Sequence, residues 1–144
     1  MNNNEPLIEF KDVSKIYHMG DETIRAADHI SFKIYKGEFI AIVGQSGSGK
    51  STLCNALVGL IPHYFVGKMS GSVTIDGSVV EDSTIADLST KIGLVFQNPF
   101  NQLSYTAGTV AEELAYGLGN RGIPREEMIK KVDTVAKLMR IDHI

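Results

Sequence analysis

The chain has 144 residues, of which 43% are hydrophobic and 22% are charged, and its formal net charge is −3. This length and composition fit one globular domain with a hydrophobic core. The slight acidic excess, with Lys130-Lys131 as the single adjacent basic pair, excludes a broad basic surface, so we expect no nucleic acid partner. No apolar run approaches the roughly 18 residues of a membrane span, and we expect no direct span.

The opening third of the sequence predicts β structure. Residues 7–10 and 30–34 alternate apolar and polar side chains, as half-buried antiparallel strands do. After a turn at Lys36-Gly37, residues 39–43 form an unbroken apolar run. Such a run is typical of a strand that is covered on both faces in a parallel sheet.

From Ser51 the apolar period changes to that of a helix, which Gly59 and Pro62 end. Within it, Cys54 has no partner for an intrachain disulfide, and we expect a small buried side chain there. Residues 72–75 then predict a strand that runs into a turn at Asp76-Gly77.

The remaining elements are one strand and two helices. Residues 92–96 form a second continuous apolar strand, and residues 110–118 predict a short helix. Pro124 opens a longer helix whose apolar stripe consists of Met128, Val132, Val135, Ala136 and Met139.

A glycine-rich loop between the predicted strand 39–43 and the following helix matches G-x-x-x-x-G-K-[ST] at every fixed position. Glycines let such a loop approach phosphate oxygens, its backbone N–H groups form an anion-binding nest, and the next helix points its positive end there. The loop predicts a nucleoside triphosphate with Mg²⁺, Lys50 reaching the β and γ phosphates and Ser51 ligating the metal. The predicted nucleotide-binding residues are Gly44, Gln45, Ser46, Gly47, Ser48, Gly49, Lys50, Ser51 and Thr52.

Two further segments complete a pattern. Val13-Ser14-Lys15-Ile16-Tyr17 precedes the glycine-rich loop, and Phe96-Gln97-Asn98-Pro99 follows it. In this order, from about Leu7 to Arg140, the sequence resembles the nucleotide-binding domain of ATP-binding cassette (ABC) transporters.

The resemblance implies roles for two more side chains. Tyr17 would stack on adenine, and Gln97 would approach Mg²⁺ and the attacking water, so that Lys50 and Gln97 are the catalytic candidates and Ser51 and Gln97 the metal ligands. It also implies a second ATPase subunit, a transmembrane subunit contacted by the residues after Gln97, and a peripheral location on the cytoplasmic face of the membrane. Residues 59–64 and 97–103 look most like energy-coupling factor ATPases, which implies uptake.

Two other side chains invite a functional interpretation that the sequence does not favour. His63 comes too early to match the family's switch histidine, which indicates a surface or partner-facing residue. Asp76 ends an apolar strand, but Gly77 follows it where the family has glutamate, so a turn aspartate is expected.

Two motifs of the family have no match. No Leu-Ser-Gly-Gly-Gln loop occurs, since Leu103-Ser104-Tyr105-Thr106 lacks its glycines, and no run of four aliphatic residues ends in Asp-Glu. We therefore expect the amino-terminal, truncated part of a longer domain, with little hydrolysis by this chain alone. The missing carboxylate-bearing strand would leave sheet hydrogen bonds and apolar faces open.

The predicted fold is α/β: a P-loop core sheet with an amino-terminal antiparallel β subdomain, over residues 5–108, and the start of a helical subdomain, over residues 109–144. Two alternatives remain open from the sequence. A different P-loop enzyme, such as a small-molecule kinase, would need an acceptor site and a lid arginine, and would give Tyr17 and Gln97 no role. A non-catalytic nucleotide-binding module would need no carboxylates.

Overall fold

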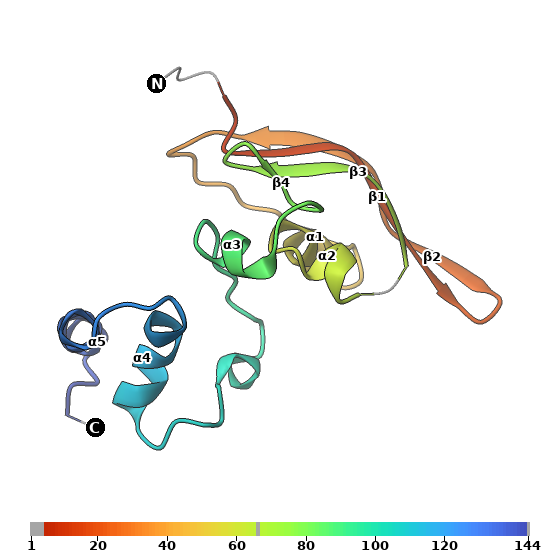
Figure 1. Cartoon of the computed structure of the whole chain (residues 1–144). Helices are drawn as coiled ribbons and strands as arrows, with labels where there is room; N and C mark the ends of the chain where they lie inside the picture. Colours follow the sequence, from red (N-terminus) through yellow and green to blue (C-terminus); the bar gives the residue numbers. More distant parts are fainter. Residues whose placement is uncertain (1–4, 66, 144) are drawn as a thin grey trace. The chain divides into compact units, whose positions relative to one another are not determined.

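The computed structural model describes residues 5–65 and 67–143, and the chain forms two compact units that divide between Leu94 and Val95. The first unit holds a β-sheet with short helices, and the second holds two longer helices (Figure 1). The predicted subdomain boundary near Thr109 stays a prediction.

The sheet has four strands in the order β2-β1-β3-β4, and every pair is antiparallel. The strands are β1 (Ile8–Met19), β2 (Glu22–Ile34), β3 (Lys68–Ile75) and β4 (Ser78–Val79). Ile8 pairs with Ile34, which confirms the antiparallel strands predicted at residues 7–10 and 30–34. Both strands extend well beyond those ranges, as a long hairpin (Figure 1).

The hairpin between β3 and β4 confirms the predicted turn. Ile75 pairs with Ser78, and the two residues between them, Asp76 and Gly77, have φ angles of 48° and 73°. Two consecutive positive φ angles define the turn that best matches the twist of a two-residue hairpin. Asp76 is therefore a turn residue, as expected.

Two short helices follow the glycine-rich loop. Helix α1 (Lys50–Leu57) ends before Gly59, whose φ of 75° separates it from α2 (Leu60–His63). The predicted helix is thus confirmed. Cys54 is half-buried, not fully buried as expected, and its thiol is free. His63 is exposed at the end of α2.

The hydrophobic core of the first unit lies between the sheet and these helices. The rings of Phe10 and Phe32 stack with centroids 4.6 Å apart. Helix α3 (Ile85–Ser89), which the sequence did not predict, begins at Thr84, whose hydroxyl accepts a hydrogen bond from the Asp87 amide. The buried apolar residues are Phe10, Val13, Ala56, Ile61, Val73, Ile75, Val80 and Leu88.

The two strands predicted from unbroken apolar runs, 39–43 and 92–96, are wrong for this structure. Neither range has strand pairing within the described residues. Phe39, Val43 and Val95 are 97%, 89% and 83% exposed. A central strand needs a hydrogen-bonded neighbour on each side, and no described segment pairs with these two. The result agrees with the expectation of open apolar faces.

The second unit consists of a 3₁₀ turn, η1 (Pro99–Gln102), followed by α4 (Val110–Asn120) and α5 (Arg125–Met139). Both predicted helices are confirmed. Thr109 and Glu112 form a capping box that fixes the start of α4, and α5 begins after Pro124. Among the described residues, no helix combines the length and apolar character that crossing a membrane requires.

A bulge in the β1–β2 pairing brings Asp12 and His29 together. Both have left-handed φ angles, 53° and 50°, and His29 Nδ1 lies 2.7 Å from Asp12 Oδ1. The His29 amide also donates to Ser14 Oγ at 2.9 Å. The hydrogen bond with Asp12 and the charge of Asp12 raise the pKa of His29, and the charge of Asp28 raises it further. Burial and the charge of Arg25 lower it by less.

We predict that Asp12→Asn lowers the pKa of His29 towards its ordinary value of 6.5, as measured by an NMR titration of the imidazole. A raised folded-state pKa means that the pair stabilises the fold fully below pH 6.5 and that this contribution is lost as pH rises through the folded value. Unfolding of the wild type should show that loss, and the variant should show less of it, because only Asp28 then raises the pKa of His29. An unchanged pKa in the variant would contradict the pairing.

Candidate nucleotide-binding site

The glycine-rich loop, residues 44–51, connects the extended segment 39–43 to the start of α1. Gly47 and Gly49 have φ angles of 83° and 87°, in the left-handed region that favours glycine. A β-carbon on Gly49 would overlap the carbonyl oxygen of Ala26 in β2. A side chain at residue 49 would therefore push the loop and α1 away from the sheet.

The Lys50 side chain folds back on the loop and forms hydrogen bonds with it. Its ammonium donates to the carbonyl oxygens of Gly44 and Gln45, at 2.8 and 2.7 Å, and to Ser48 Oγ at 3.1 Å. These three bonds use the full donor capacity of a lysine. A β-carbon on Gly44 would lie 2.5 Å from Ser48 Oγ, so a side chain at residue 44 would displace the hydroxyl that accepts from Lys50.

The amino end of α1 provides further donors. Gly49 is the N-cap and has no side chain, and no described side chain caps this end, whose first turn carries no acidic residue. The first backbone N–H groups of a helix have no partner within the helix, and the helix dipole makes this end positive. Ser51 and Thr52 lie in this first turn beside Lys50. The loop and helix therefore fit an anionic, phosphate-sized group.

Tyr17 lies close to the same helix, although 35 positions separate it from Thr52. Burial raises the pKa of the Tyr17 phenol, and a hydrogen bond with Thr52 lowers it by less. The phenol therefore stays protonated at neutral pH, and its ring is held near the first turn of α1. Two predicted site residues from distant parts of the sequence thus meet in space.

Gln97 belongs to a different unit from the glycine-rich loop. It lies in the second unit, just before η1, where the Asn98 side chain accepts a hydrogen bond from the Phe100 amide. Its predicted approach to Ser51 and Mg²⁺ stays a prediction. Among the described residues, no group of three or more His, Cys, Asp or Glu could hold a metal ion.

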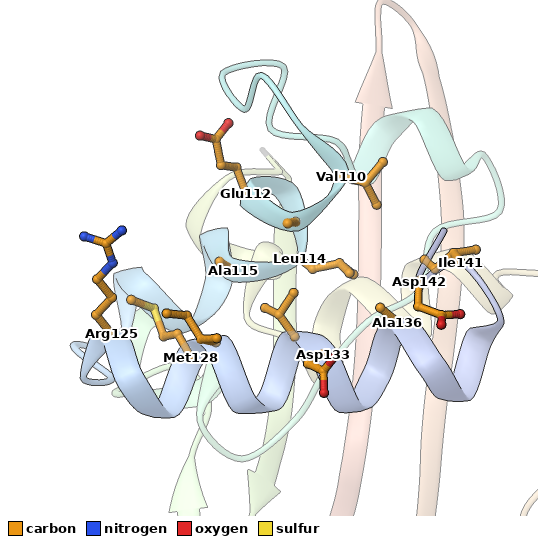
Figure 2. Close-up of a pocket in the computed structure, with 13 residues that line it drawn as sticks. Val110, Glu112, Leu114, Ala115, Arg125, Met128, Asp133, Ala136, Ile141 and Asp142 are labelled. Carbon is orange, nitrogen blue, oxygen red and sulfur yellow. The ribbon is translucent and has the colours of Figure 1, made fainter. Parts of the chain in front are cut away.

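Two cavities differ in their relation to these residues. One, of about 500 Å³, runs along the loop between β2 and residues 40–43, and Ser48, Gly49 and Lys50 line it beside Ile30 and Phe32. The other, of about 510 Å³, is a groove between α4 and α5 (Figure 2). Leu114, Met128, Ala136 and Ile141 give that groove an apolar lining, and none of the predicted site residues lines it.

Comparison with known proteins gives consistent matches. The family model described as ABC transporter matches residues 27–144. Energy-coupling factor transporter ATP-binding protein EcfA1 of Bacillus licheniformis is 45% identical over 131 residues, 91% of this chain and 44% of that protein. The structure of cbiO1 from Clostridium perfringens, part of the ABC transporter complex cbiONQ, matches with a TM-score of 0.73 at 31% identity, over 97% of this chain and 53% of that one.

A dimeric ATP-binding cassette in a post-hydrolysis state, bound to ADP and Pi, matches with a TM-score of 0.72 at 34% identity, over 90% of this chain and 56% of that one. The likeness to these structures confirms the predicted fold class. The chain spans about half the length of the proteins that it matches.

We predict that Lys50→Ala weakens binding of Mg-ATP by about 2 kcal/mol, the low end of the cost of breaking a charge pair, because residues 44–48 are exposed to water. Isothermal calorimetry on the wild type and the variant measures the difference. Lys91→Ala, which removes a lysine bound to Ser78 in the same unit, is the matched control and should bind like the wild type. Equal affinity of Lys50→Ala and the wild type would overturn the phosphate-loop assignment.

Proposed function

Because the chain belongs to the ABC transporter family, we propose that it supplies the ATP-binding part of a transporter's ATPase, holding ATP and Mg²⁺ in the loop 44–51. The observation that carries this proposal is the position of Lys50. Its ammonium is bound by backbone oxygens beside the amino end of α1, which no described side chain caps. Phosphate oxygens there could accept hydrogen bonds from both the ammonium and the first amides of the helix.

The remaining residues take roles around the same centre. Ser51 offers a hydroxyl to Mg²⁺, which would neutralise phosphate charge. Tyr17, which the Thr52 contact holds near α1, offers its ring to the base. We assign Gln97 to the positioning of water, as the family resemblance implies. These assignments favour a transporter ATPase over a small-molecule kinase, because a kinase would leave Tyr17, and so its contact with Thr52, without a role.

We further assign the chain to an uptake system, because EcfA1 of Bacillus licheniformis is described as an energy-coupling factor transporter protein. The match to a dimeric cassette supports a second ATPase subunit as a partner. A transmembrane subunit would be contacted by the segment after Gln97, where Phe100, Leu103 and Tyr105 expose apolar surface. The chain would then lie peripherally on the cytoplasmic face of the membrane.

We predict that Tyr17→Ala lowers affinity for Mg-ATP by about 1 to 3 kcal/mol, the scale of base stacking on an aromatic ring, and leaves affinity for inorganic triphosphate almost unchanged. The reason is that the variant removes the base platform and keeps the phosphate loop. Calorimetric titration with both ligands measures the two effects. A parallel loss for ATP and triphosphate would show a folding defect and would count against the stacking role.

We also predict that a polypeptide of these 144 residues binds ATP without sustained turnover. Phosphoryl transfer to water needs an electrostatic clamp on the γ-phosphate and carboxylates at the metal and the water, and the sequence has no match for the motifs that supply them. Binding that is equal in the ground and transition states does not accelerate chemistry.

Phosphate release at saturating ATP tests this prediction, with Lys50→Ala as the background for contaminating ATPase. Release that stays at the level of the variant is expected. Turnover near one per second that disappears in Lys50→Ala would contradict it, and would show that these residues contain a complete catalytic apparatus.

A further inference from the structure

Lys15 is a buried lysine that none of the roles above uses. It is 1% exposed, in the middle of β1, two residues before Tyr17. Side chains at i and i+2 of a strand lie on the same face, so Lys15 and Tyr17 share one side of the sheet. Burial of an ammonium costs free energy unless its surroundings compensate the charge, so the partners of Lys15 show how its burial is stabilised.

The ammonium has two kinds of partner. It donates to the carbonyl oxygens of Phe65 and Gly67, at 3.1 and 3.0 Å, and its nitrogen lies 4.9 Å from the centroid of the Tyr17 ring, over the ring face. A β-carbon on Gly67 would lie 3.1 Å from the same nitrogen, so the glycine leaves space for the charge. Burial lowers the pKa of Lys15, as expected for a desolvated amine.

These contacts fix the Tyr17 ring at two places. The Lys15 ammonium covers one face, and the hydrogen bond with Thr52 holds the phenol edge. A cation within about 6 Å of a ring centroid is attracted to the ring face, and the attraction is stronger when the cation is desolvated, as Lys15 is. Stacking of a base needs only one ring face, and because Lys15 occupies one face a base would have to take the opposite one.

We infer that Lys15 is a positioning residue for nucleotide binding: it holds the Tyr17 ring from behind, so that the ring presents its other face to the base. The inference rests on the proposed ATP site and deepens it, because it makes recognition of the base depend on a residue that does not touch the nucleotide. Affinity for the phosphates, which Lys50 and the loop supply, should not depend on Lys15.

The test is a mutant cycle on the ratio of the affinities for Mg-ATP and Mg-triphosphate, measured by calorimetry. Lys15→Met keeps the length of the side chain and removes the charge. It should lower the ratio by about three- to thirtyfold in the wild type and in Tyr17→Phe, which keeps the ring, and by less than twofold in Tyr17→Ala. Lys11→Met, an exposed lysine on the same strand, is the control and should leave the ratio unchanged.

An unchanged ratio in Lys15→Met, or an equal loss in the Tyr17→Ala background, would overturn the inference. If instead Tyr17→Ala alone leaves the ratio unchanged, the base platform of the proposed site fails, which is a different result. A purely structural role of Lys15 would lower both affinities together.

A second measurement needs no variant at Lys15 and decides the question even if Lys15→Met does not fold. Protons above an aromatic ring face shift upfield in NMR, so the Lys15 ε-methylene signals should be upfield in the wild type and lose the shift in Tyr17→Leu. Addition of Mg-ATP should preserve the shift, because the base takes the opposite face. Loss of the shift on binding would show that the base displaces Lys15, and would overturn the inference.

Discussion

The close approach of Gly49 to the Ala26 carbonyl oxygen is the constraint on which the site depends. It lets the start of α1 lie directly against β2, with no space for a side chain between them. Because β1 pairs with β2, the same contact sets the distance from α1 to β1, and so allows Thr52 to reach Tyr17. The glycine-rich loop and Tyr17, from separate parts of the chain, are therefore held in one frame by backbone packing, which is less compliant than a contact between flexible side chains.

Two lysines in this unit have their ammonium charges compensated by backbone carbonyl oxygens, but they differ in burial. Lys15 and Lys50 each donate to two backbone carbonyl oxygens, but Lys15 is buried and Lys50 lies in an exposed loop. Because Lys15 is only 1% exposed, its ammonium is bound by protein groups and can serve as a support for the Tyr17 ring. Lys50 can exchange its acceptors for phosphate oxygens because water reaches the loop during the exchange. Burial, rather than residue type, distinguishes Lys15, which we propose supports Tyr17, from Lys50, which we propose binds phosphate.

Sequence reasoning succeeded where the determinants are local. The β3–β4 turn follows from Asp76-Gly77, α1 from the helical period of its apolar residues, and α5 from the apolar stripe after Pro124. The length of the β1–β2 hairpin was missed because bulges between Phe10 and Ile16 interrupt the alternation of side chains. The strand predicted at residues 39–43 was wrong because an apolar run predicts burial only. Strand formation also requires pairing with other segments, which a local pattern does not show. The Tyr17–Thr52 and Lys15–Tyr17 contacts depend on tertiary packing, which no local pattern encodes. The predicted approach of Gln97 to the glycine-rich loop depends on how the two units pack, which neither unit determines by itself.

The exposure of segment 39–43 also bears on the energetics of the loop that follows it. Within the described residues no strand pairs with this segment, so Gly44 and Gln45 are held chiefly by the bonds that their carbonyl oxygens accept from Lys50. A phosphate that draws Lys50 away must then replace that support with its own hydrogen bonds to the loop amides. Part of the binding free energy is spent on ordering the loop, and the observed affinity is reduced by that amount. Pairing of residues 39–43 with a neighbouring strand would remove the cost, because the loop would then be ordered before the nucleotide arrives. Strand pairing of residues 39–43 and affinity at the proposed site would in this way be linked through Lys50 and the two carbonyl groups.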